Sequence, residues 1–407
     1  MTAHQTNRGF FTAIGALTLS LSSLVLFLWQ GVALFLRDAG QSSEVVGLLF
    51  LAGIPWILRF IWSPLVDRTG FPGIGHFRSW ILGTQLVLVV GVLLLAATDP
   101  ATTPYQIIAI LAALSIFMGT QQTAIFGLMA ARLAPAERVK GMTVQTVAYA
   151  SASVLMGLGV LYLLAGFGWR PTVLAIAACS LFFLLIIAPL KLDSGQRLST
   201  VGPKFLSQFA VLRDRRVRRL LGASLLVSVA VASTYGLQSL MLVDAGLSVS
   251  DASLVAIVGT GAIGLFGGYL AKPLTERFGG YAVVSMIGLG LAVSCLGFGI
   301  GLQKGLEPAL VIAAILTNSF FFFGLLPSSK SLLIGYCGQG REATDFAAYS
   351  GVEGLFFMIA SSIFASLVDL FGYSAILMGA GICALAGANF AWSIRRDADA
   401  TTKEGLA

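Results

Sequence analysis

Long apolar runs separated by short polar segments make up almost the whole chain. Each run holds about 20 residues or more, which is long enough for a helix to cross a hydrocarbon core of about 30 Å. The pattern predicts an all-α membrane protein with twelve transmembrane helices. The expected spans are about 10–36, 45–66, 79–98, 105–132, 140–165, 170–190, 219–243, 252–274, 281–302, 308–336, 344–368 and 373–394.

The longest polar segment, about residues 191–218, divides the twelve runs into six and six. Two local repeats support this division: FLRDAGQSSEVVGLL pairs with MLVDAGLSVSDASLV, and PLVDR pairs with PLTER further along each half. Two matches in the same order indicate two pseudo-symmetric six-helix halves. We expect an N-terminal half at 1–190, a cytoplasmic linker at 191–218, and a C-terminal half with a short tail at 219–407.

The composition excludes several classes of protein. Charged residues are 11% of the chain and hydrophobic residues 57%, whereas a soluble domain carries roughly 25% charge. The four cysteines and two histidines show no paired spacing, so we expect neither disulfides nor a metal site. No nucleophile–base set or GxxxxGK[ST] phosphate loop occurs. The chain is therefore not expected to be an enzyme or to hold a cofactor, and its first apolar run is too long for a cleavable signal peptide.

The net charge of +7 is distributed by side of the membrane. If both termini are cytoplasmic, twenty-one Lys and Arg residues fall on the inner side and three on the outer side, with Arg59 inside a span. This asymmetry follows the positive-inside rule and predicts that both termini are cytoplasmic. The charge thus indicates topology and contact with anionic lipid rather than a nucleic-acid partner.

A polar hinge follows the second span and recurs in the second half. It reads WSPLVDRTGFPGIGHFRSWILGTQ from Trp62, and its shortened copy reads AKPLTERFGG from Ala271. We expect its two acids to accept hydrogen bonds from helix N-termini and from arginines of neighbouring spans when the inner side is closed. The alternative is that these residues only mark topology. The expected gating residues are Asp67, Arg68, Arg78, Glu276 and Arg277.

Two charges lie inside apolar spans. Arg59 lies about 12 Å from Asp67 along the second span, and Glu353 lies roughly 13–15 Å into the eleventh, at 1.5 Å per residue. A charge at this depth normally faces a cavity or a partner. We hypothesise that Arg59 and Glu353 pair across a central cavity or take part in proton coupling. The alternatives are a static ion pair and separate snorkelling.

The internal repeats indicate a two-fold transporter, in which a cargo site would lie near the midplane between the repeats. Aromatic rings with a few amides suit a flat, partly aromatic chelate better than a sugar polymer, and Lys330 could meet an anionic cargo. A phenylalanine run at 320–323 is expected to contribute at most two rings to the site. The candidate residues are Trp29, Gln30, Gln121, Gln122, Gln145, Tyr149, Tyr235, Gln238, Asn318, Lys330 and Tyr349.

The repeats and the acid–arginine loops resemble those of the major facilitator superfamily across essentially the whole chain. The superfamily's loop motif runs Gly-x-x-x-Asp-Arg-x-Gly, and Ser63 stands here at its first glycine. The runs WSPLVDR and RSWILGTQ resemble the AmpG-type muropeptide permeases and the RhtX/FptX-type siderophore permeases. The residues that carry this local resemblance are Trp62, Pro64, Arg78, Trp80 and Gln85.

The two groups imply different cargoes. Muropeptide permeases tend to be longer and carry acids in the fourth span, where this chain reads Thr120-Gln121-Gln122-Thr123-Ala124. The resemblance therefore favours a monomeric transporter of the bacterial inner membrane. It would import an iron–siderophore complex, such as a pyochelin-like chelate, with protons by alternating access. The alternatives are a muropeptide permease and, after it, drug or metabolite efflux. A membrane receptor or assembly protein that does not transport is the rival from another class.

Overall fold

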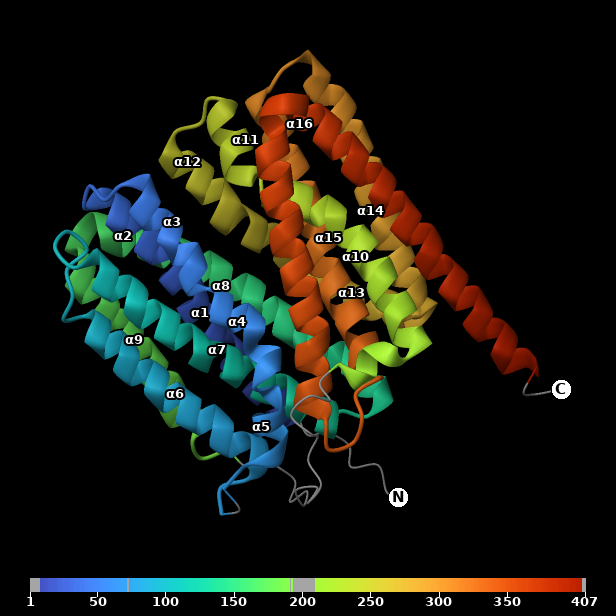
Figure 1. Ribbon diagram of the computed structural model, residues 1–407, viewed down its shortest axis with the longest axis horizontal. Helices are drawn as coiled ribbons and strands as arrows, with labels where there is room; N and C mark the ends of the chain where they lie inside the picture. The colour runs from blue at the N-terminus through green and yellow to red at the C-terminus, as the bar shows by residue number, and fades with distance from the viewer. Residues whose placement is uncertain (1–7, 72, 191, 193–208, 405–407) are drawn as a thin grey trace. The chain divides into compact units, whose positions relative to one another are not determined.

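The computed structural model describes residues 8–71, 73–190, 192 and 209–404 of the 407-residue chain (Figure 1). Contacts group these residues into two units. The first holds Met1–Ala210 together with Cys337–Gly351, and the second holds Val211–Tyr336 together with Val352–Ala407. Most of the predicted linker lies outside the described residues, and the predicted domain boundaries stay a prediction.

The helices of the first unit follow the predicted spans. The first span is one long helix that contains a π-helical segment, and the second is a series of short helices. In chain order they are α1 Arg8–Leu26, η1 Phe27–Gly31, α2 Val32–Asp38, α3 Ser43–Ala52, α4 Ile54–Ile57, η2 Leu58–Ile61, α5 Ser63–Arg68, α6 His76–Leu95, α7 Pro104–Arg132, η3 Pro135–Glu137, α8 Arg138–Phe167 and α9 Trp169–Ile187.

The second unit differs in detail, since its first span is interrupted at residues 236–237 and its π-helical segment lies in its second span. Its last helix, α16, turns back on itself at Gly372, whose φ of 73° favours glycine (Figure 1). The elements are η4 Ala210–Arg213, α10 Arg215–Tyr235, α11 Gln238–Asp244, α12 Val249–Ser253, η5 Leu254–Gly259, α13 Thr260–Phe278, α14 Gly280–Gly301, η6 Leu302–Lys304, α15 Pro308–Ile334 and α16 Glu342–Glu404.

The described part of the chain contains nine helices long and apolar enough to cross a membrane. One of these is α16, which counts once although its two legs, on either side of Gly372, correspond to the eleventh and twelfth predicted spans. The broken second span and α8 are not among the nine but occupy the positions of the second and fifth predicted spans. The prediction of an all-α, multi-pass membrane protein is confirmed.

Prolines explain why the second span is broken. Pro55 and Pro64 each stand in the first turn of a short helix, where the missing N–H would have no helical partner. Between α4 and α5 the backbone narrows to the 3₁₀ segment Leu58–Ile61. Short 3₁₀ stretches inside a helix often mark a functional hinge. This segment sets the direction of Arg59.

Within each unit the helices pack closely through small residues. In the first unit α6 lies against α7 and α9, and in the second unit α13 lies along α15. The closest approach is at Gly267 of α13, where an added Cβ would come within 2.1 Å of the backbone oxygen of Phe320 on α15. A backbone oxygen cannot swing aside as a flexible side chain can. The contact therefore requires glycine.

We expect Gly267→Ala to lower the free energy of unfolding by about 1–3 kcal/mol, because the two helices must separate to admit the methyl group. The measurement is the midpoint of thermal unfolding in detergent. Gly297→Ala in α14 is the matched control, since its added Cβ would meet nothing within 4 Å. The control is expected to unfold at or above the wild-type temperature. Equal midpoints for the two variants would contradict the close contact of α13 with α15.

Candidate polar and aromatic transport site

A buried amide network joins four helices of the first unit. Gln121 of α7 donates to the side-chain oxygen of Gln85 on α6 at 2.6 Å. Gln85 in turn donates to the hydroxyl of Ser20 on α1 and to the carbonyl of Ser180 on α9, at 3.2 and 3.1 Å. Gln121 is fully buried. Its amide group thus helps to hold α1, α6, α7 and α9 together, and a substrate-binding role for Gln121 stays a prediction.

The neighbouring Gln122 belongs to a different cluster. Its side-chain oxygen accepts a hydrogen bond from the indole Nε1 of Trp56 at 2.9 Å. The rings of Trp56 and Trp29 lie 4.6 Å apart between centroids, tilted by 49°. The guanidinium of Arg59 lies 5.5 Å from the centre of the Trp56 ring and donates to the Trp56 carbonyl at 2.9 Å. The fold thus brings the predicted residues Trp29, Gln122 and Arg59 together around Trp56.

Glycine lets α7 approach this cluster. A Cβ added at Gly119 would lie 3.0 Å from Cδ1 of Trp56 and 3.2 Å from Cβ of Arg59. One residue further on, the hydroxyl of Thr120 accepts a hydrogen bond from the indole of Trp62 at 2.9 Å. The α7 backbone therefore supports both ends of the short helices that carry Arg59.

The other candidates of the first unit lie elsewhere on its helices. Gln145 and Tyr149 are partly buried on α8. Tyr349, at the start of α16, is fully buried, so it belongs to the packed interior. Gln30 follows Trp29 in the π-helical segment, and its side-chain oxygen is buried without a hydrogen-bond partner among the described residues.

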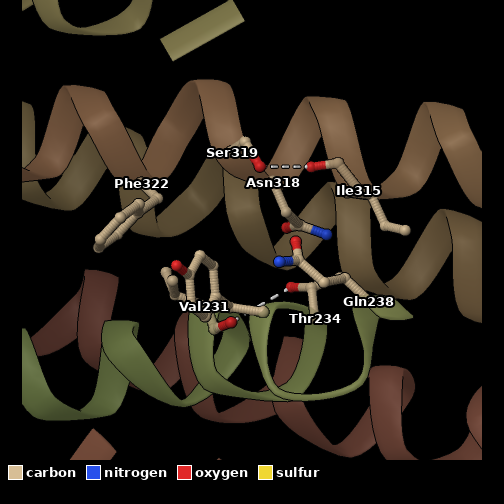
Figure 2. Close-up of a pocket in the computed structure, with 8 residues that line it drawn as sticks. Val231, Thr234, Gln238, Ile315, Asn318, Ser319 and Phe322 are labelled. Atoms are coloured by element: carbon tan, nitrogen blue, oxygen red, sulfur yellow. Dashed lines mark hydrogen bonds between the residues drawn. The ribbon is translucent and has the colours of Figure 1, made fainter. Parts of the chain in front are cut away.

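A small pocket in the second unit brings three predicted residues together. It has about 220 Å³ of empty space and is lined by Val231, Thr234, Tyr235, Gln238, Ile315, Asn318, Ser319 and Phe322 (Figure 2). Figure 2 shows the amides of Gln238 and Asn318 pointing toward each other from α11 and α15. This volume includes space open to solvent, and the enclosed part has room for about one water molecule. The pocket in this structure is therefore too small to enclose a larger ligand.

The polar groups of this pocket are held in place. Asn318 accepts a hydrogen bond from the thiol of Cys295 at 3.5 Å and donates to the Ala314 carbonyl at 3.1 Å. The Tyr235 ring lies 6.3 Å from that of Phe322 and 5.7 Å from that of Phe357. Phe322 is the member of the phenylalanine run that lines the pocket, which agrees with the expectation of at most two.

The partner of Glu353 differs from the predicted one. Glu353 on α16 forms an ion pair with Lys330 on α15, and both side chains are only about one-sixth exposed. The expected role of Lys330, meeting an anionic cargo, stays a prediction. The two residues meet because α15 and this part of α16 belong to the same unit. The pairing of Glu353 with Arg59 stays a prediction.

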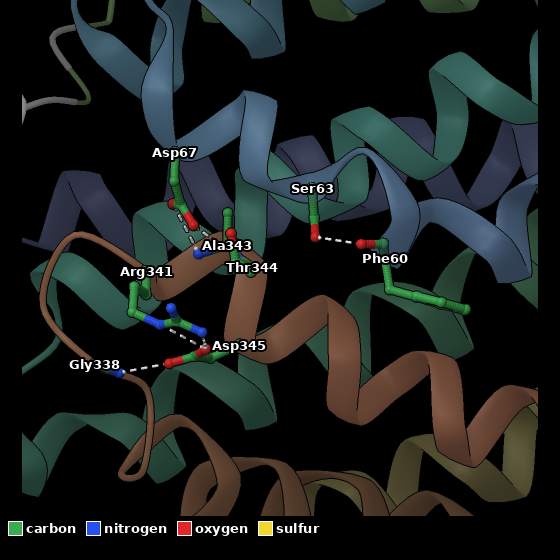
Figure 3. Close-up of polar contacts among 8 residues, drawn as sticks. All are labelled: Phe60, Ser63, Asp67, Gly338, Arg341, Ala343, Thr344 and Asp345. Atoms are coloured by element: carbon green, nitrogen blue, oxygen red, sulfur yellow. Dashed lines mark hydrogen bonds and ion pairs between the residues drawn. The ribbon is translucent and has the colours of Figure 1, made fainter. Parts of the chain in front are cut away.

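The hinge acid of the first half behaves as expected. The Asp67 carboxylate at the end of α5 accepts hydrogen bonds from the backbone N–H groups of Ala343 and Thr344, at 3.0 and 2.7 Å (Figure 3). These groups open α16, where the helix dipole favours a negative charge. Asp67 lies beyond the apolar run of its span, and burial raises its pKa to about 7, although these N–H bonds act to lower it.

The turn before α16 is fixed by a second acid. The Asp345 carboxylate accepts from the backbone N–H of Gly338 at 3.0 Å and from the guanidinium of Arg341 at 3.2 and 3.0 Å (Figure 3). A little further along, the rings of Phe346 and Phe126 stack at 3.9 Å. The beginning of α16 is therefore bound to α5 by the Asp67 carboxylate and to α7 by an aromatic stack, while Asp345 fixes the turn itself.

The hinge acid of the second half does not follow this pattern. Glu276 is exposed and pairs with Lys272 on the same helix at 3.2 Å. The predicted arginine partners also differ. Arg78 donates to the carbonyls of Ile74 and Ala188, and Arg277 lies over the ring of Phe278. Arg68 is exposed. The prediction that both acids accept from helix N-termini is thus correct for Asp67 and wrong for Glu276.

Several residues of the two clusters were not among the predicted site residues. Trp56 is the centre of the first cluster, and its position next to Pro55 and three residues before Arg59 was a usable signal. Thr234 and Ser319 line the pocket, but small hydroxyl residues are common in membrane helices, so their sequence carries little information.

Comparisons with known proteins agree on one family. Residues 9–354 match the model of the Major Facilitator Superfamily. The anhydromuropeptide permease of Escherichia coli (strain K12) is 26% identical over 393 residues, which cover 91% of this chain and 75% of the permease. An uncharacterized protein of Haemophilus influenzae is 32% identical over 172 residues, 41% of this chain and 40% of that protein. The chain thus matches less than half of the Haemophilus protein's length.

The solved structures support the same fold. The crystal structure of FucP, a transporter of this superfamily in the outward conformation, superposes with a TM-score of 0.75. The two share 14% sequence identity, and the alignment covers 94% of this chain and 98% of FucP. The prediction of a transporter rather than an enzyme is confirmed. The chain belongs to the major facilitator superfamily.

Proposed function

We propose that the chain is a secondary transporter of the bacterial inner membrane that carries a peptidoglycan fragment of the muropeptide class. The observation that carries this proposal is that each unit gathers aromatic rings and side-chain amides at one place. Trp29, Trp56 and Gln122 meet in the first unit, and Tyr235 and Gln238 line the pocket of the second. Aromatic faces beside amides suit sugar rings and peptide groups. The similarity to the Escherichia coli anhydromuropeptide permease supports the same substrate class.

The sequence argument for a siderophore depended on the absence of an acid from residues 120–124 and on the length of the chain. Gln121 is enclosed in the amide network of α1, α6, α7 and α9, whereas its neighbour Gln122 lies in the Trp56 cluster. The lack of an acid in this stretch therefore still supports the siderophore as second candidate. We place the iron–siderophore complex second, because the Escherichia coli permease that aligns with most of this chain is named for a muropeptide.

The proposed mechanism is alternating access coupled to protons, with both termini in the cytoplasm. The distribution of Lys and Arg supports the orientation. Asp67 supports a gating step, since it binds the first residues of α16, whose later residues belong to the other unit. Breaking these hydrogen bonds would release the helix from the first unit. We expect the transporter to act as a monomer.

The test is uptake into liposomes that hold the purified protein, with and without an inward proton gradient. We expect labelled anhydromuropeptide to accumulate when the gradient is present. Gln238→Ala and Trp56→Ala should each lower the rate about 10-fold, which corresponds to about 1.4 kcal/mol of lost interaction. Phe266→Ala is the control, because this side chain is 65% exposed on the outside of the unit.

Each other outcome has its own meaning. Accumulation of a ferric siderophore in place of the muropeptide would contradict the proposed substrate and support the second candidate. Movement of neither compound would favour efflux of another molecule, or a membrane receptor that does not transport. Equal loss of uptake in Phe266→Ala would mean that the variants act through folding rather than through the two clusters.

A further inference from the structure

Arg59 carries a buried positive charge. Most of the N–H donors of its guanidinium have no hydrogen-bond partner among the described residues. Its side chain lies in the 3₁₀ segment of the second span and is 7% exposed. Its guanidinium donates to the Trp56 carbonyl, and no described carboxylate of its unit lies within ion-pairing distance of it. A guanidinium has five N–H donors in a fixed fork that matches a carboxylate. Most of these donors are therefore available to a ligand.

One further polar atom beside Arg59 is also without a partner. The indole Nε1 of Trp29 is a buried atom with no hydrogen-bond partner among the described residues. The Trp29 ring lies 4.6 Å from that of Trp56, tilted by 49°, and the indole N–H of Trp56 is held by Gln122. The cluster thus offers a cation and one further donor beside two aromatic faces. Buried polar groups without partners call for an explanation, and an absent ligand supplies one.

Two irregular helical segments meet at this cluster. Trp29 and Gln30 lie in the π-helical segment Phe27–Gly31, and Arg59 lies in the 3₁₀ segment Leu58–Ile61. π-Helical segments frequently occur at functional sites. At membrane depth an irregular backbone is tolerated where it is enclosed in protein or lines a cavity. The two segments come from different spans, so they provide an observation independent of the unpaired charge.

We propose that Arg59, with Trp29 and Trp56, forms a subsite for a carboxylate of the transported substrate. The guanidinium binds the carboxylate by two parallel hydrogen bonds, and the indoles contact the apolar or sugar face beside it. This inference rests on the proposed function for the identity of the substrate. Muropeptides carry carboxylates on a peptide next to sugar rings, which matches the chemistry of the cluster. The counter-charge of Arg59 is then the carboxylate of the substrate rather than Glu353.

The test is binding, followed by tryptophan fluorescence of the purified full-length protein in detergent. The probes are an anhydromuropeptide with free carboxylates, the same compound with its carboxylates amidated, and the smaller pair benzoate and benzamide. The wild type should bind each acid at least 10-fold more tightly than its amide. Arg59→Gln should abolish this preference, and Arg59→Lys should keep part of it. Thermal unfolding is measured on every variant.

The subsite and the proposed function can fail separately. If the muropeptide does not bind but benzoate is preferred to benzamide only when Arg59 is present, the subsite stands and the proposed substrate is wrong. If Arg59→Gln keeps the wild-type preference for acids, the subsite is overturned. Arg59→Gln should unfold at or above the wild-type temperature, since it removes an unpaired buried charge. A lower unfolding temperature of Arg59→Gln that is not additive with that of Glu353→Gln would instead indicate an ion pair between these residues.

Discussion

Asp67→Asn is expected to lower transport about 10- to 100-fold while leaving the protein folded. The two N–H bonds that Asp67 accepts at the beginning of α16 are charge-assisted, and each bond to a charged group contributes roughly 1.5–3 kcal/mol. Asparagine has the same shape, but its NH₂ group cannot accept from either backbone N–H. A loss of about 1.4–2.8 kcal/mol changes the ratio of two conformations by about 10- to 100-fold.

The measurement is substrate uptake into liposomes at pH 8. The pKa of Asp67 is about 7, so the wild-type carboxylate is ionised in most molecules at this pH. Glu276→Gln is the matched control, because Glu276 occupies the corresponding position of the second repeat but pairs only with Lys272 on its own surface. An exposed pair of this kind contributes at most about 1 kcal/mol. Uptake by this control should stay within about twofold of the wild type.

The asymmetry of the two hinge acids makes the prediction specific. Equal losses in Asp67→Asn and Glu276→Gln would contradict it, and would mean that both acids act alike in a conformation other than this one. Wild-type transport by Asp67→Asn would mean that the bond to α16 is dispensable. A fall in the amount of folded Asp67→Asn protein would place the effect in stability, so the yield after size-exclusion chromatography is measured for each variant.

The positions of the helices were predictable because length and hydropathy alone decide which segments can span a bilayer. The irregularities within the spans were less visible. Pro55 and Pro64 signal a disturbed second span, since neither can donate in a helix. The π-helical segment at Phe27–Gly31 contains no proline and follows from tertiary packing. No local pattern in the sequence predicts it.

The residue types of the candidate site were predictable from the sequence. The directions in which their side chains point were not. Gln121 and Gln122 are adjacent in the sequence, so their side chains point about 100° apart on the helix. One enters the buried amide network, and the other meets Trp56. Without the rotation of α7 the sequence does not distinguish them. Gln85, quoted for its family resemblance, has a structural role that residue type alone does not reveal.

Contacts between residues far apart in the sequence were the hardest feature to predict. Depth along the span predicts that Glu353 lies inside the membrane, but it does not say which neighbouring helix supplies the counter-charge. Lys330 was assigned to the inner end of its span, from which its long side chain reaches Glu353. The repeat correctly paired Asp67 with Glu276 by position, yet only Asp67 meets a helix N-terminus. Equivalent positions in a repeat need not have equivalent partners.

Glu353→Gln is expected to destabilise the protein by about 3–5 kcal/mol, because it leaves the Lys330 ammonium in a part-buried site without its counter-charge. Lys330→Met should cost a similar amount for the reverse reason. The double variant, which has neither charge, should recover most of the lost stability, since neutral groups of similar size tolerate burial. The unfolding midpoint in detergent measures all three. Removal of the exposed Lys272–Glu276 pair is the comparison and should cost at most about 1 kcal/mol.

The double variant also separates stability from proton coupling. If Glu353 carries the coupled proton, the stable double variant should still exchange substrate down its gradient but fail to accumulate it when a proton gradient is applied. Exchange and accumulation are measured on the same liposomes, so a folding defect would lower both. Full gradient-driven accumulation by the double variant would remove Glu353 from the coupling mechanism. The Lys330–Glu353 pair would then serve only to join α15 to α16, and coupling would have to depend on another titratable group.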